Sequence, residues 1–139
     1  MDLNKIEKVK EYLKSYEKLI RQIKRSEIKI QEMRLHKMNP SVVNDGIPHS
    51  SGQKDLSDYA ALLDQEERQC KEYKARSIRK CIEITNQIEK LSDEDEKDIL
   101  TYRYIKLMKW EEIAVKMHFS WQYTHKIHAR ALKNFKIGD

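Results

Sequence analysis

The chain has 139 residues, of which 37% are charged and 39% are hydrophobic, and its formal net charge is +5. Its three glycines and two prolines are too few for the many turns of a β-sandwich or of a nucleotide-binding α/β fold. No apolar run reaches the about 18 residues of a membrane-spanning helix and the N-terminus lacks a signal-peptide stretch, so we expect an all-α cytoplasmic protein without a membrane partner.

The first predicted element is a long helix over residues 4–37, which contain neither Gly nor Pro. Its apolar residues repeat in alternating steps of three and four, as in a coiled coil. They are Ile6, Val9, Leu13, Tyr16, Ile20 and Ile23. Glu27 interrupts this stripe and Ile30 resumes it.

Residues 38–55 hold both prolines and two of the three glycines, which predicts a linker. Residues 56–90 again lack both residue types and predict a second long helix, whose apolar stripe is weaker because Glu66 and Ser77 interrupt it. Since the two helices match in length, we expect a coiled-coil-like antiparallel helical hairpin over residues 1–90.

Two thin amphipathic helices bury little apolar surface together, so a bare hairpin would be only marginally stable. We expect a second copy of the chain to cover it, which makes a homodimer. The competing arrangement is a monomer in which the C-terminal part covers the same apolar stripe. Cys70 and Cys81 lie on the second helix and are expected to be small core residues with reduced thiols.

Residues 91–139 hold seven of the eleven aromatic residues, which predicts a compact core there. A first helix is expected after Ser92, with Asp95 completing a capping box. The charge changes sign along this part. There are four basic and seven acidic residues in 91–112, and five basic residues against one acidic residue in 113–139.

A second short helix is predicted over residues 110–117 and a third, basic helix over 121–135. Ser120 is suited to cap the third helix. Its expected inner face consists of Thr124, Ile127, Ala131 and Leu132. A short helix, a short turn and a longer basic helix describe a helix-turn-helix.

Beyond this arrangement of helices, the segment contains a specific sequence pattern. They read Trp-Glu-Glu-Ile-Ala at 110–114, then a turn that ends in Phe119-Ser120, then Ile127, and then Ala-Arg-Ala-Leu-Lys at 129–133. This pattern, over residues 91–136, resembles region 4 of bacterial sigma-70-type factors. The layout of the whole chain is similar, more loosely, to small transcriptional regulators of Gram-positive phages and prophages of the ArpU and RinA type.

The resemblance implies that residues 91–139 form a DNA-binding domain of a transcriptional regulator, with double-stranded DNA as partner and RNA polymerase as a candidate partner. Nothing in the chain resembles the other parts of a complete sigma factor. The chain departs from the family pattern at the turn, where His118 replaces Gly and is expected to accept a positive φ. It departs again at Trp121, Tyr123 and His125, where the family usually has arginines.

The third helix is the predicted DNA-reading element. A glutamine side chain can pair with adenine, a lysine can reach guanine or phosphate, and an aromatic ring can contact a thymine methyl. The predicted DNA-binding set is Ser120, Trp121, Gln122, His125, Lys126, Arg130 and Lys133. Within it, Arg130 and Lys133 are expected to contact phosphates, together with Lys116 and Lys136. The alternative for Arg130 is an ion pair with an acid of the helix that opens near Asp93.

Other classes of function have weaker support. His118, His125 and His128 lack a fourth ligand nearby, so no metal site is predicted. There is no Gly-rich phosphate loop and no nucleophile elbow, so neither an enzyme nor a cofactor is predicted. Two alternatives stay open: a phage DNA-packaging small subunit, and a coiled-coil interaction scaffold that binds no specific DNA sequence.

Overall fold

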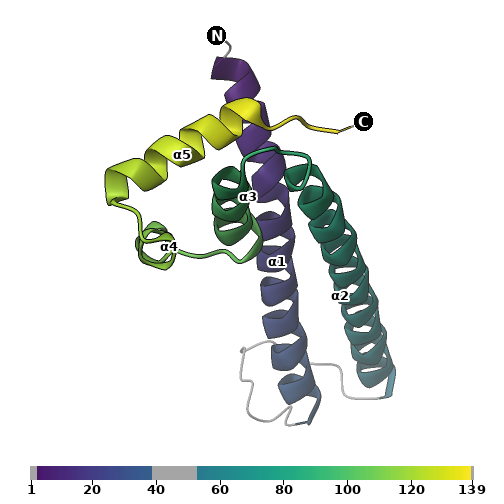
Figure 1. Cartoon of the computed structure of the whole chain (residues 1–139). Coiled ribbons are helices and arrows are strands. Elements are labelled where there is room, and N and C mark those ends of the chain that lie inside the picture. The colour runs from purple at the N-terminus through teal and green to yellow at the C-terminus, as the bar shows by residue number, and fades with distance from the viewer. Residues whose placement is uncertain (1–2, 39–52, 139) are drawn as a thin grey trace. The chain divides into compact units, whose positions relative to one another are not determined.

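The computed structural model describes residues 3–38 and 53–138, which contain helices, turns and loops but no strand. This confirms the all-α class. The elements in chain order (Figure 1) are α1 (Leu3–Met38), α2 (Gln53–Ile88), α3 (Glu94–Leu100), the π-helical turn η2 (Thr101–Ile105), α4 (Trp110–Met117) and α5 (Trp121–Asn134). None of these helices is long and apolar enough to cross a membrane.

The expected linker at 38–55 lies mostly outside the described residues, because 39–52 are not among them. The end of α1 at Met38 agrees with the sequence prediction to within one residue. At the other end of the expected linker, α2 begins at Gln53, slightly earlier than expected.

The chain packs as two compact units, and the division crosses both long helices. Residues 3–18 and 77–138 form one unit, which we call the composite unit, and residues 19–76 form the hairpin unit. The expected division lay at residues 90/91. The structure divides the chain elsewhere because the first half of the α1 stripe packs with the C-terminal helices as well as with α2.

The core of the composite unit joins segments from both ends of the chain. Its buried residues come from α1, α2 and the C-terminal helices: Val9, Leu13, Ile84, Ile88, Leu91, Leu100, Tyr104, Ala131, Leu132 and Phe135. Leu13 and Phe135 are both completely buried. Within this unit the C-terminal helices therefore cover the first half of the α1 stripe.

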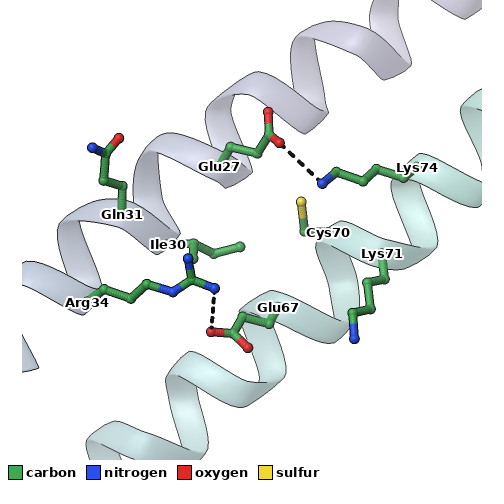
Figure 2. Close-up of a pocket in the computed structure, with 8 residues that line it drawn as sticks. All are labelled: Glu27, Ile30, Gln31, Arg34, Glu67, Cys70, Lys71 and Lys74. Atoms are coloured by element: carbon green, nitrogen blue, oxygen red, sulfur yellow. Dashed lines mark hydrogen bonds and ion pairs between the residues drawn. The ribbon is translucent and has the colours of Figure 1, made fainter.

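The hairpin unit pairs α1 and α2 in antiparallel register. Ion pairs join Glu27 to Lys74 at 3.2 Å and Arg34 to Glu67 at 3.1 Å (Figure 2). As the residue number rises along α1, the number of its partner on α2 falls, which is the antiparallel arrangement. Ile30 and Cys70 lie between these pairs, and together with Ile23 and Leu63 they form a small buried core.

Two serines are buried on the inner faces of α1 and α2, at or next to the positions where the sequence predicts a break in the apolar stripe. Ser26 is buried where the stripe appears to break, while the carboxylate of the exposed Glu27 pairs with Lys74 of α2. Ser77, read as an interruption, is buried in the composite unit. Small side chains therefore continue the inner face of each helix. Cys70 is buried, Cys81 is partly buried, and both are free thiols.

The start of α3 corrects one local prediction. Asp93, and not Ser92, caps the helix, because its Oδ2 accepts a hydrogen bond from the Glu96 N–H at 3.0 Å. The first turn of α3 is acidic, which suits the positive end of the helix dipole. The helix continues as η2 and ends before Leu107, whose φ of 56° turns the chain toward α4.

Candidate nucleic-acid interface

The turn between α4 and α5 lies where the sequence predicts it. The α4 helix ends at Met117, and the next residue, His118, caps it in the expected left-handed conformation with φ 60° and ψ 38°. Its N–H donates to the Val115 carbonyl at 3.2 Å, and the next N–H, of Phe119, donates to the Ala114 carbonyl at 3.0 Å. These bonds satisfy carbonyls at the helix end, which offsets the about 1–2 kcal/mol that a left-handed non-Gly residue costs.

Ser120 caps α5 as predicted. Its Oγ accepts a hydrogen bond from the Tyr123 N–H at 3.0 Å. The four positions predicted as the inner face of α5 are all buried: Thr124, Ile127, Ala131 and Leu132.

A second apolar cluster fixes α5 to its neighbours. Ile127 packs with Ile99 of α3 and Ile113 of α4, and all three are completely buried. Partly buried side chains surround this cluster, among them Trp110 and Phe119. Because one face of α5 is held in this way, the opposite face is presented to solvent as a rigid surface.

The predicted DNA-binding residues fall into three groups. Four of them are exposed on α5 and at its cap, and no contact with another described residue draws their side chains away from this surface. They are Ser120, Gln122, Lys126 and Lys133. Trp121 is 47% exposed, and its ring packs on a neighbour. The other two, His125 and Arg130, take part in contacts within the fold.

His125 is half-buried between two tryptophan rings. Its ring centroid lies 4.6 Å from that of Trp110 and 4.5 Å from that of Trp121. Its Nε2 is buried and has no hydrogen-bond partner among the described residues. The sequence predicts His125 on the outer, DNA-reading face, whereas the structure packs its ring between those of Trp110 and Trp121. The reason is Trp110, which lies at the start of α4 and covers this side of α5.

Arg130 ties α5 to α3. Its Nε donates to Glu96 Oε2 at 2.7 Å and its Nη2 donates to Asp93 Oδ2 at 3.0 Å. Asn134 donates to both oxygens of the same Glu96 carboxylate at 3.1 and 3.2 Å. Glu96 is only 3% exposed, and the hydrogen bond to it raises the pKa of Arg130. This is the alternative considered for Arg130. The other two cations of α5, Lys126 and Lys133, have no ion-pair partner among the described residues.

His128 has a structural role that the sequence pattern did not lead us to predict. This side chain is buried, and its Nε2 lies 2.8 Å from the Tyr104 hydroxyl. The pKa of His128 is lowered to about 4, first by burial and then by nearby positive groups, which belong to Lys10, His125, Arg103 and Lys14. Burial also raises the pKa of Tyr104 to about 12. One signal was available: position 128 follows 124 by four and precedes 131 by three, so it shares their inner face.

Positive charges on and near α5 would attract a polyanion such as DNA, whereas negative charges at the start of α4 would repel it. Lys116, Lys126 and Lys133 are exposed, and none of them has an ion-pair partner in the part of the chain that the structure describes. Glu111 and Glu112 add negative charge at the opposite end of α4, where the helix dipole favours it. The positive surface is therefore local to α5 and to the end of α4.

Comparison with known protein families gives a match over most of the chain. A family described as "Protein of unknown function (DUF1492)" matches residues 36–136. No curated protein and no solved structure matches the chain. The matched range includes α2, α3, α4 and α5, and with them every predicted DNA-binding residue. Because the match covers more than half of the chain, the protein belongs to the DUF1492 family.

Proposed function

We propose that this protein is a DNA-binding transcriptional regulator that reads duplex DNA by placing α5 in the major groove. The observation that carries the proposal is the division of α5 into two faces. One face is fixed to α3 and α4 through Ile127. The other offers an amide and two ammonium groups that form no ion pair within residues 3–38 and 53–138. The major groove is wide enough to admit a helix, and such groups match its hydrogen-bonding edges.

The side chains take different roles in this proposal. Gln122 lies in the first turn and pairs with adenine, while Lys126, one turn later, reaches guanine or a phosphate. Lys133 and Lys116 contact phosphates and so position the domain without reading sequence. Arg130 is left out of the proposed interface, because Glu96 and Asp93 already bind its guanidinium group.

The resemblance of residues 91–136 to sigma-70 region 4 supports a role in transcription. The looser resemblance to regulators of the ArpU and RinA type favours a phage or prophage setting. On this account the protein acts in the cytoplasm on double-stranded DNA, with RNA polymerase as a second partner.

The partner of the hairpin unit is proposed to be a second copy of the chain. Between α1 and α2 lies an open groove, with Ile30 and Cys70 on its apolar floor and charges of both signs on its rims (Figure 2). Ile20 and Tyr73 are only partly buried by the two helices. A second hairpin would cover the exposed parts of Ile20 and Tyr73. A groove whose rims carry both positive and negative charges can face the same groove of a second copy.

A homodimer would carry two α5 helices and would favour a target with two half-sites. Sedimentation equilibrium tests this step, because a dimer has twice the mass of the 16.7 kDa chain. Ile20→Asp should return the mass to that of one chain, since a charge buried in the interface without a partner is costly. Far-UV circular dichroism must show that the variant keeps its helices.

The experiment that tests the main proposal is selection of bound duplexes from a random pool with the full chain. A regulator should recover one short sequence motif. A DNA-packaging subunit should recover no motif and should form large rings in solution. An interaction scaffold should show no salt-dependent affinity for DNA at all. Either of these last two outcomes would overturn the proposal.

A further inference from the structure

Two aromatic side chains are exposed in the first turn of α5, and each packs against the ring of a neighbouring residue. Trp121 is 47% exposed and Tyr123 is 42% exposed. The ring of Trp121 packs on that of His125, with 4.5 Å between the centroids. The ring of Tyr123 meets that of Phe119 edge-on, with a centroid distance of 4.8 Å and an interplanar angle of 88°.

The support for Trp121 reaches into the fold. His125, under Trp121, also lies on Trp110, and the Arg103 guanidinium lies over the Trp110 ring at 4.7 Å. Arg103 is fixed in turn, because its Nη1 donates to the Met108 carbonyl at 3.0 Å. The exposed ring is therefore the last member of a stack that begins in η2. Rigid aromatic side chains lose little conformational entropy when they make a contact.

The same surface has no free arginine. Guanine is most often read by the bidentate guanidinium of an arginine. The only arginine of α5 is Arg130, and its ion pairs with Glu96 and Asp93 hold it against α3. The polar group that remains in the first turn is the Gln122 amide, whose donor and acceptor match the N6 and N7 atoms of adenine.

These groups are arranged around one turn of the helix. Successive residues of an α-helix are about 100° apart around its axis, so Gln122 lies between the two rings, one on each side. An aromatic ring makes apolar contact with the C5-methyl group of thymine, which only A·T pairs present in the major groove.

Resting on the proposed function, we infer that α5 reads a site of neighbouring A·T pairs. Gln122 pairs with an adenine, and Trp121 and Tyr123 contact the methyl groups of flanking thymines. Tyr123 is thereby a specificity-determining residue, although it replaces an arginine of the sigma-factor pattern. The basic residues further along α5 contribute affinity without restricting the sequence.

The test uses the full chain and the duplex recovered by random-pool selection. Each thymine of the motif is replaced in turn by deoxyuridine, which removes only the methyl group. We expect about a fourfold loss of affinity at each of two positions, from the transfer free energy of one buried methyl. Replacing thymines outside the motif should leave the affinity unchanged.

Three variants connect these methyl groups to their partners. Tyr123→Ala should abolish the deoxyuridine effect at one position, and Trp121→Ala should abolish it at the other. Tyr123→Phe keeps the ring and should retain the effect. Ile137→Ala is the matched control, because this exposed apolar residue lies after α5.

The outcomes separate the two proposals. If no duplex is enriched by selection, the proposed function fails. If a duplex is enriched but its core consists of G·C pairs, the inference fails while the proposed function stands. The same holds if deoxyuridine has no effect at any position, or if Tyr123→Phe loses the effect as completely as Tyr123→Ala does.

Discussion

Replacing His128 by Gln should flatten the dependence of stability on pH below neutrality. In the folded chain His128 is buried beside Tyr104, and its pKa is lowered to about 4 from the usual 6.5. Between about pH 6.5 and pH 4, His128 is therefore neutral in the folded chain, whereas in the unfolded chain it binds a proton. Its contribution to stability is complete above about pH 7 and is lost as the pH falls from 6.5 towards 4.

The size of this effect follows from the two pKa values. Each pH unit between 6.5 and 4 costs about 1.4 kcal/mol, so on the order of 3 kcal/mol of unfolding free energy is lost over this window. Positive groups on three elements keep the proton away: Lys10 and Lys14 on α1, Arg103 on η2 and His125 on α5. Glutamine can accept the Tyr104 hydrogen bond but does not titrate.

Urea denaturation at pH 7.5, 6, 5 and 4 measures the effect. All other titrating groups are shared by the two proteins, so the difference in unfolding free energy between wild type and His128→Gln should shrink steadily as the pH falls. Tyr104→Phe should keep most of the wild-type pH dependence, because burial is the main cause of the lowered pKa. Parallel profiles for wild type and His128→Gln would refute the reasoning.

Three further predictions concern the core, the ion pairs and the DNA surface. Leu13→Ala should lower the unfolding free energy by about 2–5 kcal/mol in urea, because Leu13 is fully buried; an unchanged midpoint would argue against the composite core. Arg130→Ala should destabilise the fold by leaving Glu96 buried without its cation. Lys133→Ala should instead leave the urea midpoint unchanged and reduce the salt slope of DNA binding by about 1; the reverse pattern would make Arg130 the phosphate contact. The double variant Gln122→Ala, Lys126→Ala should lose on the order of 2–4 kcal/mol of specific binding in anisotropy titrations, and an unchanged sequence preference would remove both residues from the interface.

The turn between α4 and α5 could be predicted because local chemistry decides it. A serine hydroxyl caps a helix through its own backbone neighbours, so Ser120 needs no distant partner. His118 likewise takes a positive φ because the chain must leave α4 within a few residues. Burial along α5 followed from the helical repeat, as Ile127 and Ala131 show.

The composite unit could not be predicted in the same way. Val9 and Leu13 form an apolar stripe that fits a coiled-coil partner and the C-terminal helices equally well, so sequence periodicity cannot decide between them. The pairing of Arg130 with Glu96 spans 34 residues, and a basic residue on a helix looks the same whether it faces an acid or solvent. His125 was predicted on the outer face but packs against Trp110 of α4. This is a contact between two helices, which the sequence pattern of one helix does not show.

The most direct measurement for the central claim is the ratio of two affinities of the full chain. Fluorescence anisotropy at physiological salt should compare the duplex selected from a random pool with a duplex of the same composition in scrambled order. A sequence-reading α5 predicts at least about a 10³-fold preference for the selected duplex. Equal affinity for the two duplexes, or no binding at any salt concentration, would contradict the account.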